Sequence, residues 1–296
     1  MLKLSDQNVR VLHIESTDAC NAACPQCLRE VDTSFNKTNL DHLTVNQIKN
    51  LIDENSIREL DKIYMCGNYG DPAAGKHTLE IFRYFRRINQ NITLGMNTNG
   101  GLRSIDWWKE LAEIFSRPVE HPKEYVVWSI DGLEDTNHIY RKNVNWDKVM
   151  ENANAFISAG GKAHWEMLVF KHNQHQVDQA QSLAKKLGFK WFRAKVSRRF
   201  NNYPVKFLDP PIGWQDPIVK PGPIDCQAIK DKSLYISAKG KIYPCCWLAV
   251  SDYTFDKFQL VRQSWDSDPV KICLDTCSKN QFGSSFTCQW QREVEL

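Results

Sequence analysis

Three cysteines lie within eight residues near the start of the chain, at Cys20, Cys24 and Cys27. Cysteines this close together in a chain without a secretory signal usually bind metal rather than form a disulfide. Paired C-x-x-C knuckles dominate zinc sites, and a closed structural site needs four ligands. Three thiolates on a four-iron cluster would leave one iron open, as a catalytic centre requires. The spacing therefore predicts an open metal centre, and a zinc or redox knuckle is the alternative.

The segments around this loop alternate between strand-like and helix-like patterns. Apolar runs of strand length lie at 10–15, 61–66, 92–96, 125–130, 164–170 and 190–196, and helical spacing lies between them at 44–54, 79–85, 105–116, 149–157 and 177–187. This alternation predicts an α/β protein with right-handed βαβ units and a parallel sheet. A partial (β/α)6 TIM-like barrel and a doubly wound sheet both fit. In either fold the cysteine loop lies at the carboxyl ends of the strands, where ligands bind.

Composition narrows the class of protein. A net charge of +3 over 296 residues gives no strong indication of a nucleic-acid partner. The first residues contain no apolar signal segment, and no run of eighteen apolar residues predicts a membrane span. Ten cysteines then point to metal binding in a reducing compartment, so we expect a cytoplasmic protein without a membrane partner.

A proline-rich segment divides the chain. Six of the twelve prolines lie between residues 201 and 225, a density that excludes regular helix and central strand. We therefore predict three parts: a barrel over residues 1–200, a bridge over 201–225, and a small cysteine-rich α+β domain over 226–296. In the last part, alternating residues around Lys239 and Gly240 predict a β-hairpin.

The C-x3-C-x2-C spacing after a first strand resembles the signature of the radical S-adenosylmethionine (SAM) superfamily. The resemblance implies that Cys20, Cys24 and Cys27 hold a [4Fe-4S] cluster whose fourth iron is chelated by SAM. It also implies the partial barrel. One departure is Gln26, because the family usually has an aromatic residue before the last cysteine.

Later strand ends carry further parts of the resemblance. Gly70-Asp71-Pro72 is similar to the family's Gly-Glu-Pro segment, and Thr98-Asn99-Gly100 matches a common family motif. Ser129-Ile130-Asp131-Gly132, with Arg141 following, is the best match outside the cysteines. The residues that the resemblance assigns to SAM binding are Gly70, Asp71, Asn99, Ser129, Asp131, Arg141 and Glu166. Arg141 is the candidate for the SAM carboxylate, since a guanidinium binds a carboxylate through two hydrogen bonds.

Basic residues gather near the sixth strand, at Arg193, Lys195, Arg198 and Arg199. At the mouth of a barrel they would bind an acidic substrate group, and the alternative is a solvated basic edge. The sequence leaves three substrate classes open: a small metabolite, a nucleotide or a peptide, each with an acidic group.

The cysteines near the C-terminus resemble those of SPASM and twitch extensions, which hold auxiliary [4Fe-4S] clusters. We predict one auxiliary cluster with Cys226, Cys245, Cys273 and Cys277 as ligands, and Cys246 or Cys288 as replacements for one of the last two. Adjacent cysteines such as Cys245 and Cys246 are poorly placed to bind one cluster. A zinc site would use the same residues.

The function that the resemblance implies is reductive cleavage of SAM to a 5′-deoxyadenosyl radical, which abstracts hydrogen from a substrate. It also implies an external one-electron reductant such as flavodoxin or ferredoxin, and an auxiliary cluster that accepts an electron. The alternative function is a non-catalytic zinc-binding protein that contacts a partner, or RNA, through its arginines.

Overall fold

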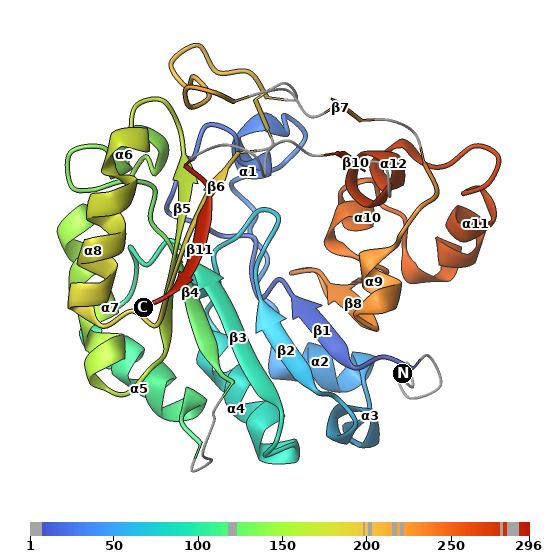
Figure 1. Cartoon of the computed structure of the whole chain (residues 1–296). Coiled ribbons are helices and arrows are strands. Elements are labelled where there is room, and N and C mark those ends of the chain that lie inside the picture. Colours follow the sequence, from blue (N-terminus) through green and yellow to red (C-terminus); the bar gives the residue numbers. More distant parts are fainter. Residues whose placement is uncertain are drawn as a thin grey trace.

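The computed structural model describes residues 8–117, 123–197, 199–200, 203–214, 218–219, 222–278, 281–282 and 290–296. Within these ranges the chain forms a nine-stranded sheet with the order β11-β6-β5-β4-β3-β2-β1-β8-β9 and a small two-stranded sheet. Figure 1 shows the large sheet with its carboxyl edge beside the loop that leads to the short helix α1.

Six strands of the large sheet are parallel and follow one another in chain order. They are β1 (Val11–Ile14), β2 (Lys62–Met65), β3 (Thr93–Thr98), β4 (Tyr125–Ser129), β5 (Ala163–Val169) and β6 (Trp191–Val196). A doubly wound sheet would reverse its strand order at a switch point, and this sheet does not. The partial (β/α)6 barrel predicted from the sequence is therefore confirmed.

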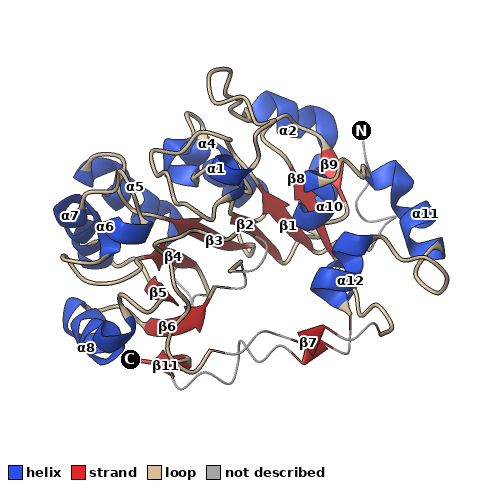
Figure 2. Cartoon of the chain, turned by 90° about the horizontal axis from the view of Figure 1, so that it is seen from above, coloured by secondary structure: helices blue, strands red, loops and turns tan. Residues whose placement is uncertain are grey.

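The strands bury alternate residues, which explains the two faces of the sheet. In β1, β2 and β6 every second residue is buried and the others are half-buried. Figure 2 shows the strands in an open arc with the long helices on its outer side, so the buried residues pack beneath the helices and the others face the inside of the arc.

Five of the six helices of the arc are those the periodicity predicts, with bounds that differ by a few residues, and the exception is the short helix over residues 54–58, which was not predicted. They are α2 (Val45–Leu51), α3 (Glu54–Arg58), α4 (Thr78–Ile88), α5 (Ile105–Phe115), α7 (Trp146–Ser158) and α8 (Val177–Leu187). Local signals fix their ends: Ser104 and Asn145 accept N-terminal backbone hydrogen bonds, and Gly188 ends α8 with φ of 88°. The hydrophobic pattern does not predict two one-turn helices, α1 (Leu28–Val31) and α6 (Asn137–Tyr140), because they are too short to show helical periodicity.

The two edges of the arc are extended by the last third of the chain. The predicted hairpin is present as β8 (Ser233–Ile236) and β9 (Ile242–Tyr243), and β8 pairs in parallel with β1. At the other edge, β11 (Arg292–Glu295) pairs antiparallel with β6. Within the described part of the proline-rich segment, regular structure is limited to β7 (Ile218–Val219), which pairs with β10 (Gln281–Phe282).

Four short helices follow the bridge and lie beside the hairpin in Figure 1: α9 (Gln227–Lys230), α10 (Cys246–Val250), α11 (Phe258–Gln263) and α12 (Lys271–Cys277). They bury a core of their own, made of Leu248, Val261 and Cys273, apart from the large core of the barrel. The exact boundaries of the three predicted parts stay a prediction. No helix in the described ranges is long and apolar enough to span a membrane.

Candidate functional site

The loop that carries the first three cysteines connects β1 to α1. Cys24 is buried, and Cys20 and Cys27 are half-buried. The backbone N–H of Cys27 donates to the carbonyl oxygen of Cys24 at 2.9 Å, so the loop turns back on itself before α1 begins. Burial raises the pKa of Cys20 to about 12 and that of Cys24 to about 11. A bound metal ion would favour the thiolate forms that this burial disfavours.

Groups from three other loops approach these sulfurs. The Asn99 side-chain amide lies 3.6 Å from Cys20 Sγ, and an Arg141 guanidinium nitrogen lies 3.7 Å from Cys24 Sγ. The Cys27 thiol donates to the backbone oxygen of Asn68 at 4.0 Å. Asn68 follows β2, Asn99 follows β3, and Arg141 follows α6. The carboxyl ends of the parallel strands therefore converge on the cysteine loop, as expected for this fold.

Asp71 joins the loop after β2 to the end of β3. Its buried carboxylate accepts hydrogen bonds from the backbone N–H of Ala73 (2.9 Å), the Thr98 hydroxyl (2.8 Å) and the backbone N–H of Asn99 (2.6 Å). Burial raises the pKa of Asp71, and these three donors oppose the rise. Asp71 thus fixes the position of Asn99 beside Cys20.

Gly70 is required by the close approach of two loops. A Cβ atom at this position would lie 1.8 Å from the backbone oxygen of Thr17, at the start of the cysteine loop. Only glycine lets the loop after β2 pack against that backbone. The sequence resemblance assigns Gly70 and Asp71 to SAM binding, and the contacts seen give both a structural role as well.

Asp131 and Arg141 form a buried ion pair at the end of β4. Arg141 Nε donates to Asp131 Oδ2 at 2.6 Å, and the other carboxylate oxygen accepts the backbone N–H of Leu168 at 2.6 Å. Burial raises the pKa of Asp131, and the Arg141 charge opposes that rise. The pair is oriented so that the guanidinium of Arg141 reaches both Asp131 and Cys24.

Ser129 and Glu166 are register partners on the neighbouring strands β4 and β5. Glu166 pairs with Lys195 (Nζ to Oε1, 2.5 Å) and more loosely with Arg193 (3.8 Å). The predicted basic cluster is therefore divided: Arg193 and Lys195 face Glu166 inside the arc, while Arg199 donates to the backbone oxygen of Gln26 at 2.6 Å. Arg198 lies outside the described residues.

Gln26, which the sequence marked only as a departure, makes several buried contacts in the structure. Its side chain is fully buried, accepts from the Ser197 hydroxyl at 2.9 Å, and donates to the Tyr203 backbone oxygen at 3.2 Å. With Arg199, these contacts attach the cysteine loop to the end of β6. An apolar aromatic ring at this position would make none of these hydrogen bonds.

Glu15 was not identified from the sequence. Its buried carboxylate follows β1 directly and accepts from the backbone N–H groups of Tyr69 (2.8 Å) and Gly70 (3.2 Å) and from the Tyr235 hydroxyl (2.6 Å). It thereby joins the barrel to the hairpin. The available signal was an acid directly after a buried strand, at the edge where ligands bind.

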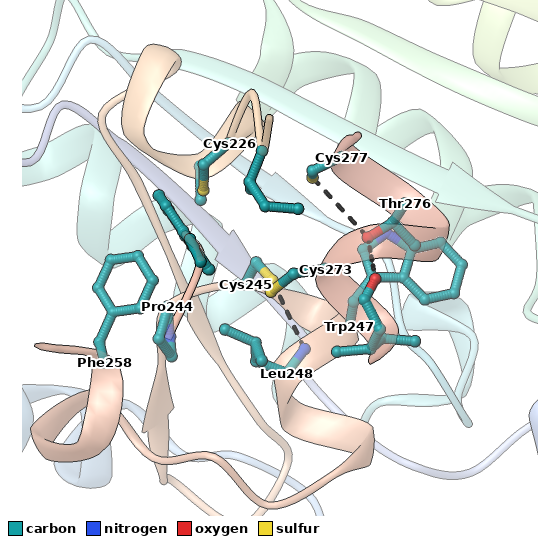
Figure 3. A pocket seen from close by; sticks show the side chains of 13 residues that line it. Cys226, Pro244, Cys245, Trp247, Leu248, Phe258, Cys273, Thr276 and Cys277 are labelled. Carbon is teal, nitrogen blue, oxygen red and sulfur yellow. Dashed lines mark hydrogen bonds between the residues drawn. The ribbon is translucent and has the colours of Figure 1, made fainter. Parts of the chain in front are cut away.

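The second group of cysteines meets in one pocket between the C-terminal helices. Cys226, Cys245, Cys273 and Cys277 all line it, with Pro244, Trp247, Leu248 and Phe258 among its other walls (Figure 3). Cys226 and Cys245 are N-caps of α9 and α10, and Cys245 Sγ accepts the backbone N–H of Leu248 at 3.5 Å. Cys246 does not line the pocket, and Cys288 lies outside the described residues.

Two observations test whether this pocket fits a metal cluster. The buried Trp265 indole N–H lines the pocket beside Cys273 and opposes the rise that burial causes in the pKa of that thiol, so this donor faces one of the four sulfur atoms. Within the described ranges, no three His, Cys, Asp or Glu side chains are close enough to hold a single metal ion. What the pocket does offer is a donor set of four cysteine thiols, the ligands that an iron–sulfur cluster uses.

Sequence comparison relates the barrel to known proteins. Residues 14–184 match the family model described as "Radical SAM superfamily". The GTP 3′,8-cyclase of Syntrophomonas wolfei subsp. wolfei is 26% identical over 102 residues, which cover 34% of this chain and 30% of that protein. The chain thus matches less than a third of the length of that relative.

Solved structures share the fold at low sequence identity. SuiB of Streptococcus suis bound to S-adenosylmethionine superposes with a TM-score of 0.57 and 16% identity, covering 90% of this chain and 68% of that one. The enzyme anSMEcpe with bound AdoMet gives a TM-score of 0.55 and 16% identity, covering 95% and 78%. The family match covers more than half of the chain and includes the loop in which the carboxyl ends of the strands surround three cysteines. The chain belongs to the radical SAM superfamily.

Proposed function

We propose that this protein is an enzyme that cleaves SAM reductively and abstracts a hydrogen atom from a substrate. Cys20, Cys24 and Cys27 hold a [4Fe-4S] cluster in this proposal. When bound, the cluster supplies one electron that breaks a sulfonium C–S bond of SAM, giving methionine and a 5′-deoxyadenosyl radical. The observation that carries the proposal is the convergence of Asn99 and Arg141 on the sulfurs of a three-cysteine loop.

The residues around the loop have separate tasks. Arg141 is held by Asp131 and keeps guanidinium N–H groups for the SAM carboxylate. Asn99 is held by Asp71 and offers its amide to the same region. The remaining proposed contacts of SAM are Gly70, Ser129 and Glu166. Orientation by these residues, and exclusion of water by the buried ion pair, are what the protein contributes to the reaction.

The pocket of the C-terminal helices is proposed to hold an auxiliary [4Fe-4S] cluster. Four cysteines would complete the coordination of all four irons. The backbone N–H of Leu248, which already donates to Cys245 Sγ, and the indole N–H of Trp265 would donate to sulfur atoms of the site. Such a cluster has no open position for SAM. It would exchange electrons with the substrate or with a reductant such as flavodoxin or ferredoxin, in the cytoplasm.

Metal analysis of anaerobically purified protein tests the proposal first. Two clusters give brown protein with about eight iron atoms and eight sulfides per chain. SAM and dithionite then give 5′-deoxyadenosine in the wild-type protein and none in Cys24→Ala. Cys66→Ala, which changes a cysteine of neither group, keeps the activity. Colourless protein that contains zinc would favour the alternative, a zinc-binding interaction protein, and contradict the proposal.

A further inference from the structure

The inner face of the arc contains an open cavity of ≈ 360 Å³. Five neighbouring strands, β2 to β6, supply its walls, which are Tyr64, Asn97, Tyr125, Val127, His164, Glu166, Trp191 and Arg193. Apart from Glu166, none of these residues belongs to the proposed contacts of the cysteines or of SAM. The cavity therefore needs an explanation of its own.

Four aromatic rings cover the lower part of this wall, and we call Tyr64, Tyr125, His164 and Trp191 the aromatic band. The rings of Tyr125 and His164 are stacked with centroids 5.5 Å apart, and His164 and Trp191 are 5.4 Å apart. Gly95 makes room for the band, because a Cβ there would lie 2.7 Å from Tyr125 Cζ. All four rings are half-buried, so each keeps a surface for a flat apolar ligand.

The charges above the band favour an anion. Arg193 reaches Glu166 at 3.8 Å and Glu293 at 3.6 Å, and it donates no hydrogen bond to any described residue. Glu166 is already satisfied by Lys195 at 2.5 Å. On the other side of the band, Lys62 at the start of β2 adds a positive charge 4.7 Å from the centre of the Tyr125 ring. The guanidinium of Arg193 thus keeps N–H donors in a fork that matches a carboxylate or a phosphate.

Two polar groups of the wall are also without partners in the described part of the chain. The Asn97 amide and the Trp191 indole N–H make no hydrogen bond there, although both line the cavity. Polar groups placed among rings in a concave site are typical of ligand pockets, where they fix the orientation of the ligand.

We propose that this cavity binds the substrate of the enzyme, and that the substrate is a planar ring carrying a carboxylate or phosphate. The ring packs on the aromatic band, and the anionic group binds Arg193. Only the identification of this ligand as the substrate rests on the proposed function; the binding itself does not.

Binding measurements without reductant test the inference. The probes are guanosine 5′-monophosphate, a nucleotide, and 4-hydroxybenzoate, an aromatic carboxylate. Guanosine and phenol are the matched ligands without an anion. We expect at least one anionic probe to bind about tenfold more tightly than its neutral counterpart, as one charge-assisted contact gives. Which probe binds tells the nucleotide from the aromatic carboxylate.

Variants locate the binding. Arg193→Gln removes the tenfold preference for the anionic probe and leaves the affinity for the neutral one, while Trp191→Ala weakens both. Arg87→Gln, on the exposed side of α4, changes neither. Circular dichroism confirms that each variant is folded. Equal binding of anionic and neutral probes, no saturable binding of any probe, or unchanged binding in Arg193→Gln would overturn the inference.

Competition with SAM tests whether the probe occupies the SAM site instead of this cavity, since SAM also has a ring and a carboxylate. The probe must bind with SAM present at saturation. Displacement of the probe by SAM assigns the cavity to SAM and overturns the inference. Absence of probe binding in a protein that still forms 5′-deoxyadenosine contradicts this inference alone, whereas loss of SAM cleavage with intact probe binding contradicts the proposed function alone.

Discussion

The two groups of cysteines differ in number and in surroundings. The N-terminal loop offers three sulfurs, and the polar side chains of Asn99 and Arg141 lie 3.6 Å and 3.7 Å from two of them. The C-terminal pocket offers four sulfurs, among walls that are largely apolar, including Leu248 and Phe258. The N-terminal site has charged and polar side chains beside its sulfurs, and the C-terminal site has mostly apolar ones.

In the proposed function, this difference separates SAM cleavage at the first site from electron transfer at the second. Binding of SAM requires an open iron together with charged groups that recognise a carboxylate. Electron exchange requires neither an open iron nor such charged groups. A cluster whose irons are all coordinated, in apolar surroundings, changes its structure little when it gains or loses an electron. Cysteine number and the polarity of the neighbours therefore point to the same assignment of roles, although each was recognised from different residues.

Removing one cysteine from each group tests this separation most directly. Cys24→Ala and Cys277→Ala should each lose about four of about eight iron atoms per chain. Formation of 5′-deoxyadenosine should fall at least about a hundredfold in Cys24→Ala, because a cluster ligand is lost, and persist in Cys277→Ala. Quantification of 5′-deoxyadenosine by chromatography measures this. Equal loss of cleavage in both variants would mean that the two sites are not independent. Cys246→Ala is the control variant, and it should keep all of its iron.

The ion pair beside Cys24 has no counterpart near the other pocket. Asp131→Asn leaves the Arg141 guanidinium without its carboxylate in a buried position, where the side chains of the pair are 0% and 16% exposed. We expect a loss of about 3 kcal/mol in the free energy of unfolding, measured by denaturant titration. SAM binding should weaken as well, because Arg141 loses the contact that orients it.

A matched surface pair provides the control for this effect. Asp178 pairs with Arg292, but its side chain is 79% exposed. Asp178→Asn should therefore cost less than about 1 kcal/mol. If the two variants are equally stable, the buried pair does not support the cysteine loop.

Local sequence patterns predicted the six parallel strands, five helices of the arc and the hairpin, because strand alternation, helical spacing and turn residues are short-range properties. The four cysteines that line the C-terminal pocket were predicted with the resemblance to SPASM and twitch extensions. Such local patterns could not predict the contacts of Gln26, because Ser197 lies 171 residues away in the chain. The parallel pairing of β8 with β1 was missed for the same reason. A hairpin shows its turn in the sequence but not the edge against which it packs.

Gln26 tests how firmly the three-cysteine loop must be held. Gln26→Leu conserves approximate volume but removes the acceptor of the Ser197 hydroxyl and the donor to the Tyr203 carbonyl, which costs about 2 kcal/mol in the free energy of unfolding. We expect faster iron loss from the N-terminal cluster under a chelator, followed by absorbance, while the other cluster is unaffected. Ser182→Ala, which removes an exposed hydrogen bond on α8, should change neither quantity.

The variant Trp265→Phe tests the C-terminal pocket, and its expected effect is the smallest of these predictions. Trp265→Phe keeps a ring in the wall and removes the buried indole N–H, which lies beside the Cys273 thiol. An N–H that donates to cluster sulfur stabilises the more negative, reduced state. The reduction potential of the auxiliary cluster should therefore fall by about 40 mV, the equivalent of about 1 kcal/mol for one electron. Redox titration followed by electron paramagnetic resonance measures both clusters in one sample, and the SAM-binding cluster should keep its potential. An unchanged auxiliary potential would show that the indole does not donate to the cluster, and a shift in both would contradict the separation of the two sites.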